Sequence, residues 1–211
     1  MAVPRSPRER AKDFEGRSGA GRPRDADRHQ AVLDATRELL REAGYNHLSI
    51  DAIARRAGVS RPLIYRWWGH KARIVEEVLF RAPTREAAPD SGTLEGDLGA
   101  LVGETVATYA RREMVLGLPG LQADIVADPS LIEETEERYT RAHFQRWHEV
   151  LERAVARGEL RPGENARAVF HAAVGAITVL VQEGTFRRRE IAEFVTRLLL
   201  HGIRSPTPRS R

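Results

Sequence analysis

The sequence predicts an all-α fold of about nine helices in two domains. Apolar residues recur three and four positions apart through most of the chain, which is typical of helices with one buried face. Glycine and proline fall between these segments, at positions where helices end and begin. No stretch alternates apolar and polar residues as a half-buried strand would. Together, the three patterns favour helices throughout.

The first two helices are bounded by capping residues. Asp27 with Gln30 fits a capping box, and Gly44 stops the helix that follows. Ser49 is a candidate N-cap for the second helix, and Gly58 ends it as a left-handed residue. We therefore expect order to begin near Asp27, after an arm rich in Arg, Gly, Pro and Ser.

A short third helix and a fourth helix follow after a very short linker. Ser60 is the next candidate N-cap, and Pro62 lies in a first helical turn, where a missing N–H costs little. The third helix covers about residues 61–67 and is broken by Gly69. The fourth helix begins at "HKARIVEEVLF" and turns these residues inward: Ile74, Val75, Val78 and Leu79.

Five further helices are expected beyond residues 82–93, a junction that contains proline and glycine. Their ranges are about 94–111, 113–127, 129–157, 166–182 and 190–200. The helix at 113–127 contains "GLPG", so we expect it to be broken there. Ser130 with Glu133 predicts a capping box at the start of the next helix, and Gly202 should end the last one.

Charge and composition limit the classes of protein. Net charge is +4, and residues 1–71 carry 15 Lys or Arg against 9 Asp or Glu. The basic excess in this part indicates a polyanion partner, although a solvated tail would look the same. The chain has no cysteine, which excludes disulfides and thiolate metal sites. Without a signal-peptide pattern or an apolar run of 18 residues, we expect a cytoplasmic protein with no membrane partner.

The second and third helices form a helix-turn-helix pattern at residues 49–68, joined by Gly-Val-Ser. In this motif the second helix enters the DNA major groove with its N-terminal part at the base edges. Ile64 and Trp68 fall on the inward side of the third helix and predict core. Trp67 lies beside that face and fits either role. The expected contact face holds Arg61, Pro62, Leu63, Tyr65 and Arg66.

The stretch "LSIDAIARRAGVSRPLIYRWWGHKARIVEEVL" resembles the DNA-binding domain of TetR-family regulators. The resemblance covers about residues 27–80; the rest of the chain is similar to the family only in its layout of helices. Trp68 stands where the family usually has a phenylalanine. Leu63 stands where the family often has a small or polar residue, which would suit contact with a thymine methyl group.

The resemblance implies a homodimeric transcriptional regulator, usually a repressor, that binds double-stranded DNA at an inverted repeat and takes a small effector of unknown identity. The domains would be a disordered basic arm at 1–26, a three-helix helix-turn-helix DNA-binding domain at 27–86, a C-terminal helical effector and dimerisation domain at 87–204, and a disordered tail at 205–211. Ser49 and Lys71 would hold phosphates. The groove would be met by Arg61, Pro62, Leu63, Tyr65, Arg66 and Trp67.

The arm also contains "GAGRPRDADR", which partly matches the AT-hook element that inserts arginine into the minor groove. Arg22 and Arg24 would then contact DNA. A plain solvated arm remains the alternative reading.

The C-terminal domain offers two further predictions. The helix at 166–182 is apolar on almost every side and must be covered on two sides, by a partner subunit or by helices of its own chain. The interface candidates are Phe170, Val174, Ile177, Leu180, Val181, Ile191, Phe194, Val195 and Leu198. A broken helix would leave room for an effector. The pocket candidates are Tyr109, Met114, Leu118, Leu121, Gln122, Phe144, Trp147, His148, Leu151 and His171.

Enzyme chemistry has little support in the sequence. There is no G-x-S-x-G, no G-K-[ST] loop and no H-E-x-x-H, and His143 and His148 are five residues apart. We expect no catalytic residue, metal or cofactor. An activator, a regulator without an effector, and an effector-binding helical protein with weak DNA binding remain alternatives to the repressor.

Overall fold

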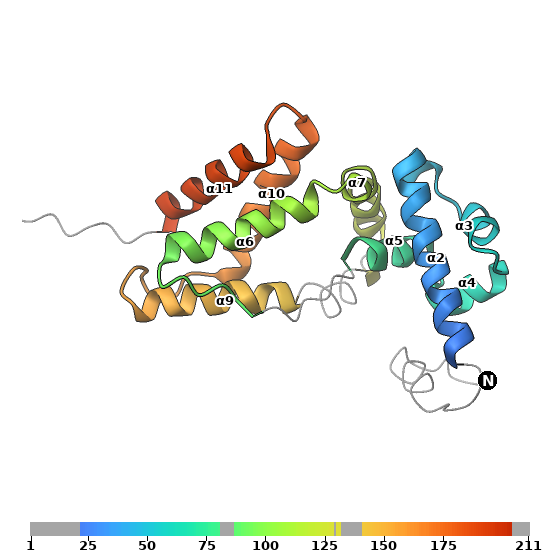
Figure 1. Cartoon of the computed structure of the whole chain (residues 1–211), viewed down its shortest axis with the longest axis horizontal. Coiled ribbons are helices and arrows are strands. Elements are labelled where there is room, and N and C mark those ends of the chain that lie inside the picture. Colours follow the sequence, from blue (N-terminus) through green and yellow to red (C-terminus); the bar gives the residue numbers. More distant parts are fainter. Residues whose placement is uncertain (1–21, 81–86, 129, 132–140, 204–211) are drawn as a thin grey trace, which may run out of the picture.

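The computed structural model describes residues 22–80, 87–128, 130–131 and 141–203. All the elements in these ranges are helices, which confirms the predicted fold class. Figure 1 shows an elongated molecule with one group of helices at each end and α7 between them. The first group is α2 (Arg22–Ala43), η1 (Tyr45–His47), α3 (Ile50–Ala57), α4 (Arg61–Trp68) and α5 (Lys71–Phe80). The rest are α6 (Leu94–Tyr109), α7 (Arg112–Ala127), α9 (Arg141–Ala156), α10 (Ala166–Glu183) and α11 (Arg188–Ile203).

The first helix begins earlier than the sequence predicted. Helix α2 starts at Arg22, five residues before Asp27, so the expected disordered arm is wrong for residues 22–26. Pro23 lies in the first turn, where helices tolerate a residue without an N–H. Asp25 in the same turn interacts favourably with the helix dipole. The rest of the arm lies outside the described residues.

Helix α7 is continuous through "GLPG", so the predicted break is wrong. Its two glycines serve close packing instead. A Cβ at Gly117 would lie 3.4 Å from methyl groups of Leu40 and Leu79, and a Cβ at Gly120 would overlap the ring of Tyr45. Pro119 stands between them inside the helix. The glycines thus let α7 approach α2 and η1, and this packing supports the helix despite the missing N–H.

The last helices agree with the sequence except at their ends. Helix α10 follows the N-cap Asn165 and ends at Gly184, a left-handed residue, close to the expected bounds. Helix α11 continues to Ile203, so Gly202 does not end it as predicted. Of the helix expected at 129–157, the structure describes 130–131 and 141–156. Glu133 of the predicted capping box lies outside the described residues, and the Ser130 N–H donates to the carboxylate of Asp128.

Two hydrophobic cores hold the described helices together. One joins α2, α3, α4 and α5 to the inner face of α7. The other joins α6, α9, α10 and α11 around Trp147 and Phe170. None of the described helices combines the length and hydrophobicity that crossing a bilayer requires.

Candidate DNA-binding surface

The helix-turn-helix forms as the capping residues predict. The Ser49 hydroxyl accepts a hydrogen bond from the N–H of Ala52 at 3.2 Å and so caps α3. Gly58 adopts the left-handed conformation (φ 66°) that ends α3. Ser60 precedes α4 in an extended conformation, with Pro62 in the first turn. These local constraints fix the short connection between α3 and α4, and with it the direction of α4.

Helix α4 separates a buried side from an exposed side. Ile64 is fully buried, and Trp68 is buried and donates its indole N–H to Glu77 Oε2 at 2.7 Å. Tyr65 is 47% exposed, which leaves its ring and hydroxyl open to a partner. Around it on the surface are Arg61, Pro62 and Arg66, with Leu63 half-buried. The buried side is the predicted core face, and the predicted contact face is exposed; its contact with DNA stays a prediction.

Trp67 lies against the core side of α4. Its ring meets Trp68 edge-on, with the centroids 5.5 Å apart, and it lies 5.8 Å from the ring of His29 on α2. The ring of His29 in turn stacks on Trp68 at 4.6 Å. Half-buried in this cluster, Trp67 has less surface to offer DNA than its neighbours, and its predicted groove contact stays a prediction.

The residues predicted to hold phosphates lie at helix starts. Ser49 is exposed in front of α3, and because its hydroxyl accepts from Ala52, it can still donate its own proton to another group. Lys71 is the first residue of α5, with its ammonium 4.2 Å from the centroid of the Tyr45 ring. Arg22 and Arg24 start α2, but their side chains lie outside the described residues.

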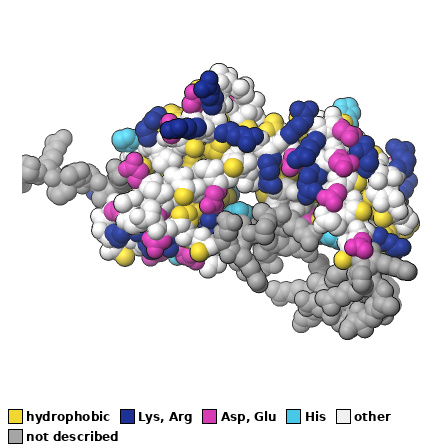
Figure 2. All heavy atoms as spheres, in the orientation of Figure 1, with side chains coloured by type: hydrophobic (Ala, Val, Ile, Leu, Met, Phe, Trp, Pro, Cys, Tyr) yellow, Lys and Arg dark blue, Asp and Glu magenta, His cyan; other side chains and the backbone are white. Residues whose placement is uncertain are grey.

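Arg56 of α3 and Arg61 of α4 each form an ion pair with an acidic side chain. Arg56 pairs with Glu42 at 2.8 Å and with Glu38 at 3.2 Å, and its hydrogen bond lowers the pKa of Glu42. Arg56 thus ties α3 to α2. The other pair joins Arg61 Nε to Asp51 Oδ1 at 2.6 Å. Figure 2 shows basic and acidic side chains mixed over this end of the molecule. Neither pair was predicted from the sequence.

Polar contacts tie both ends of α7 to the helix-turn-helix domain, and they too were not predicted from the sequence. Arg41 donates from Nε to Glu113 Oε2 at 2.8 Å and from Nη2 to Oε1 at 3.3 Å. Tyr45 donates its hydroxyl to Asp124 Oδ2 at 2.5 Å. Tyr45 follows Gly44 directly, and a side chain that packs back after a C-terminal glycine is a known signal. That signal could have placed Tyr45 in the core, though not its partner on α7.

The predicted effector residues do not surround one cavity. Met114, Leu118 and Leu121 pack in the core with α2 and α5, because α7 is unbroken. Phe144, Trp147 and Leu151 pack in the other core. Gln122, His148 and His171 are exposed. Tyr109, Met114 and Leu118 line a common void of about 10 Å³, together with Val115, Thr178, Val181 and Gln182.

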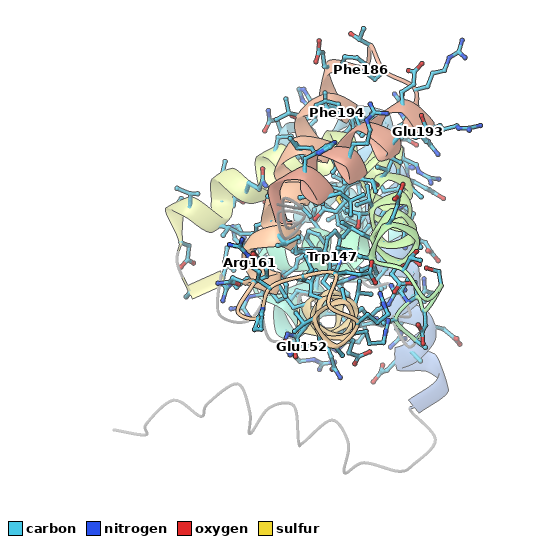
Figure 3. All side chains as sticks on the ribbon, turned by 90° about the vertical axis from the view of Figure 1, so that its left-hand side faces the viewer. Trp147, Glu152, Arg161, Phe186, Glu193 and Phe194 are labelled. Carbon is cyan, nitrogen blue, oxygen red and sulfur yellow. The ribbon has the colours of Figure 1, made fainter. Side chains whose placement is uncertain are left out.

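The predicted interface residues fall into a buried group and a group that is half-buried or exposed. Phe170, Ile177, Ile191 and Val195 are buried in their own chain, so the prediction is wrong for them. Val174, Leu180 and Val181 are half-buried. Phe194 and Leu198 are 48% and 52% exposed on α11, and Val179 and Phe186 add exposed apolar surface that was not predicted from the sequence. Figure 3 shows Trp147 among the helices, whereas Phe186 and Phe194 lie at the outer edge.

Comparison with protein families assigns both parts of the chain. The family described as "Bacterial regulatory proteins, tetR family" matches residues 32–78. The family described as "Tetracyclin repressor-like, C-terminal domain" matches residues 88–198. Among the described residues, no group of three His, Asp or Glu side chains could hold a metal ion.

Similar proteins are transcriptional regulators. The uncharacterized HTH-type transcriptional regulator YdeS of Bacillus subtilis is 34% identical over 149 residues, which are 68% of this chain and 73% of the relative. The DNA-binding transcriptional repressor TetR of Mycobacteroides abscessus is 29% identical over 64% of this chain and 72% of its own. A solved TetR regulator from Agrobacterium tumefaciens has a TM-score of 0.61 at 20% identity, covering 84% of this chain and 94% of its own.

Proposed function

This chain belongs to the TetR family of bacterial transcriptional regulators, and we propose that it is a repressor that binds an inverted-repeat operator as a homodimer and is released by a small, largely apolar effector. The family and the relatives are DNA-binding regulators rather than enzymes, in agreement with the sequence. In this proposal residues 27–86 form the DNA-binding domain and residues 87–204 the effector and dimerisation domain.

The two-sided helix α4 carries the proposal. Ile64 and Trp68 anchor it in the core, while Tyr65 and Arg66 are exposed together on its other side. An anchored helix that presents arginine and an aromatic ring suits the major groove, where arginine recognises guanine and apolar groups meet thymine methyls. Two copies related by a two-fold axis would read an inverted repeat.

Selection of bound duplexes from a random pool tests DNA recognition. We expect a site with dyad symmetry, and an affinity that falls steeply with salt as phosphate contacts release counterions. Arg66→Ala should weaken the selected site by roughly 1–3 kcal/mol and relax one base position, if Arg66 reads a base. Lys71→Ala should instead weaken all duplexes alike and make the salt dependence shallower. A selected site without dyad symmetry would contradict the proposal.

Repression itself is tested with a reporter gene placed behind the selected site. Expression should fall when the regulator is present and recover with Arg66→Ala. Expression that rises with the regulator would identify an activator.

The homodimer is supported by the exposed apolar residues of α11 and the loop before it. Phe186, Phe194 and Leu198 expose apolar surface to water, and a partner subunit that covered this surface would gain free energy. Leu198→Glu should therefore give a folded monomer with reduced operator affinity, measured by light scattering and gel shift. Val126→Glu is the matched control, since Val126 is 81% exposed on α7 and distant in sequence from this surface. A monomeric unmodified protein at micromolar concentration would refute the dimer.

The effector site is proposed at the void between α6, α7 and α10. Thr178 Oγ1 is buried there without a hydrogen-bond partner among the described residues, and burial raises the pKa of Tyr109 to about 12. The Tyr109 phenol therefore stays neutral, the threonine hydroxyl does not ionise, and both can orient a ligand. At about 10 Å³ the void has room for one water at most, so a ligand must part α7 from α10. That movement would reach the DNA-binding helices through α7.

A thermal-shift screen of drug-sized apolar compounds, followed by gel shifts, tests this site. A true effector should raise the melting temperature and weaken operator binding, and Thr178→Val should reduce both effects. The effector proposal fails if no compound does both.

A further inference from the structure

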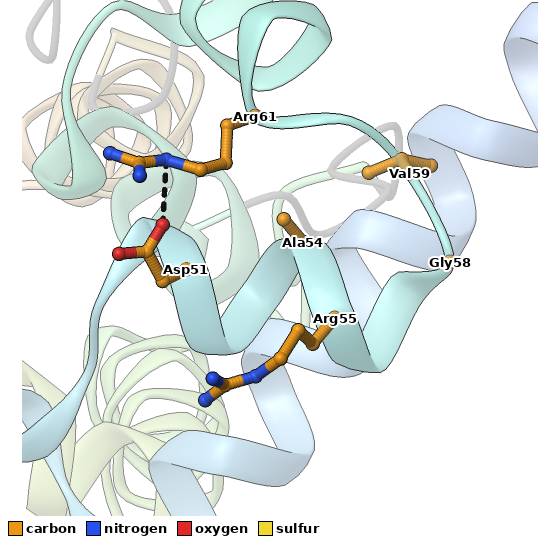
Figure 4. Close-up of a pocket in the computed structure, with 6 residues that line it drawn as sticks. All are labelled: Asp51, Ala54, Arg55, Gly58, Val59 and Arg61. Carbon is orange, nitrogen blue, oxygen red and sulfur yellow. Dashed lines mark ion pairs between the residues drawn. The ribbon is translucent and has the colours of Figure 1, made fainter.

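An ion pair crosses the turn of the helix-turn-helix. Asp51 lies in the first turn of α3 and Arg61 is the first residue of α4, with Nε 2.6 Å from Oδ1. Both side chains remain about half exposed, at 51% and 57%. They line an open hollow together with Ala54, Arg55, Gly58 and Val59 (Figure 4). The pair therefore lies at the surface that α4 would bring to DNA.

The geometry of the pair leaves the end of the guanidinium available. A carboxylate on the Nε side uses one edge of the group. The opposite edge carries one N–H from each Nη, and two parallel N–H donors match O6 and N7 of guanine. In Figure 4 the two Nη atoms extend beyond the ion pair, away from the backbone of α4.

The negative charge of Asp51 is unexpected at a surface that would meet DNA. Asp51 is two residues from Ser49, a proposed phosphate contact, so its negative charge would lie near DNA and oppose binding. Its position at the start of α3 is favourable for the helix dipole. The opposite holds for Arg61, because a cation at the start of α4 is unfavourably placed. Pairing with Asp51 offsets that disadvantage and restrains a long side chain before DNA arrives.

We propose that Asp51 is a positioning residue that sets the base preference at one operator position, by holding the guanidinium of Arg61 with its outer edge toward a guanine. The inference rests on the proposed DNA-binding function. Without Asp51, Arg61 is free to turn to the nearest phosphate, which carries no sequence information. Loss of one negative charge also strengthens binding to any duplex. Asp51→Ala therefore lowers discrimination while it raises nonspecific affinity.

The pair between Arg56 and Glu42 provides a matched control. It is also an exposed arginine–carboxylate pair between two helices, with a distance of 2.8 Å, but it ties α3 to α2. Glu42→Ala removes one negative charge, as Asp51→Ala does. The two variants lose the same charge at different places, and Arg56 keeps Glu38 as a second partner.

The experiment selects duplexes from a random pool with the unmodified protein, Asp51→Ala, Arg61→Ala and Glu42→Ala, and then measures affinities for the selected operator and its single-base variants. Arg61→Ala and Asp51→Ala should lose the same base preference, each by about tenfold in the affinity ratio. The double variant should lose no more than Arg61→Ala alone. Glu42→Ala should keep the preference, and circular dichroism should show that all variants fold.

Two results would overturn the inference: Asp51→Ala keeping the same preference as Glu42→Ala, or Arg61→Ala keeping every preference of the unmodified protein. In both cases the dyad symmetry of the selected site would persist and the proposed function would stand. Failure of the unmodified protein to select any site would instead overturn the function, and this inference with it.

Discussion

The two hydrophobic cores differ in how they relate to the chain. The buried residues of the core around Trp147 all lie between 94 and 200, within the C-terminal part. The core around Trp68 draws on α2 to α5 but also takes Met114, Leu118 and Leu121 from α7. By sequence α7 belongs to the C-terminal part, whereas its buried side chains complete the DNA-binding end. A boundary drawn from sequence near residue 86 therefore does not coincide with the boundary of packing.

Helix α7 is also attached by polar groups at both ends. Glu113, in the first turn of α7, accepts a hydrogen bond from Arg41. Asp124, near the end of α7, accepts one from Tyr45. Between them Gly120 allows the ring of Tyr45 to lie against the helix. A ligand that moves α7 must therefore move α2 and η1 or break these contacts. The DNA-binding end and α7 should behave as one unit.

The largest effects should come from the two buried tryptophans. Trp147→Ala and Trp68→Ala should each cost roughly 3–5 kcal/mol of unfolding free energy, because each leaves a large cavity. If α7 joins the two cores, the whole protein should unfold in one transition, and each variant should move that transition to a lower guanidinium concentration. Circular dichroism at a fixed protein concentration measures it. Two separate transitions for Trp68→Ala would show that the cores unfold independently.

Gly120→Ala tests the close approach of α7 to η1. The added Cβ would overlap the ring of Tyr45, so the variant should lose about 3 kcal/mol, at the upper end for overpacked sites. Gly103→Ala is the control, since a Cβ there meets nothing within 4 Å on α6. That change should add roughly 0.5–1 kcal/mol through helix propensity. Equal melting temperatures for the two variants would mean that α7 moves aside freely.

The pair of Glu113 and Arg41 should give a pH-dependent effect. The Glu113 side chain is 4% exposed, and burial alone would raise its pKa. The hydrogen bond from Arg41, a hydrogen bond from its own backbone, and the charges of Arg41 and Arg111 together outweigh burial and lower the pKa. Its stabilisation is therefore present at neutral pH and lost as pH falls below about 4.3, the unfolded pKa. Glu113→Gln should cost about 2 kcal/mol at pH 7.

The difference between Glu113→Gln and the unmodified protein should shrink as the pH falls from about 5 toward 3, measured by urea unfolding at each pH. A difference that stays constant through this range would mean that the charge of Glu113 does not stabilise the fold.

The same comparison explains what the sequence could predict. In the DNA-binding end the decisive signals are local: Ser49 and Gly58 bound α3, and Ile64 and Trp68 lie one turn apart on a short helix. Reading neighbours along the chain therefore places both faces of α4. The ion pairs were missed because Asp51 and Arg61 lie on different helices, and many rotamers of arginine are compatible with the sequence.

In the C-terminal part the helices were predictable but their neighbours were not. Helix α10 is apolar all round, so periodicity could not tell that Ile177 faces its own core while Val179 faces outward. Likewise, "GLPG" reads locally as a break, yet Gly117 and Gly120 are determined by contacts with Leu40 and Tyr45, far away in sequence. Contacts with residues far away in the sequence determine these positions, and the local pattern of a single sequence does not predict such contacts.

The smallest effect is expected for Tyr45→Phe, which removes only the hydroxyl bound to Asp124. Asp124 is partly exposed and can bind water instead, so the loss should be about 1 kcal/mol. The ring that lies under Lys71 and against Gly120 remains, so operator affinity should stay within about twofold of the unmodified protein, measured by gel shift. Tyr45→Leu, which removes the ring as well, is the comparison and should weaken both stability and binding. If Tyr45→Phe alone weakened operator binding tenfold, the bond to Asp124 would itself hold Lys71 in place, and the attachment of α7 would act through this hydrogen bond rather than through packing.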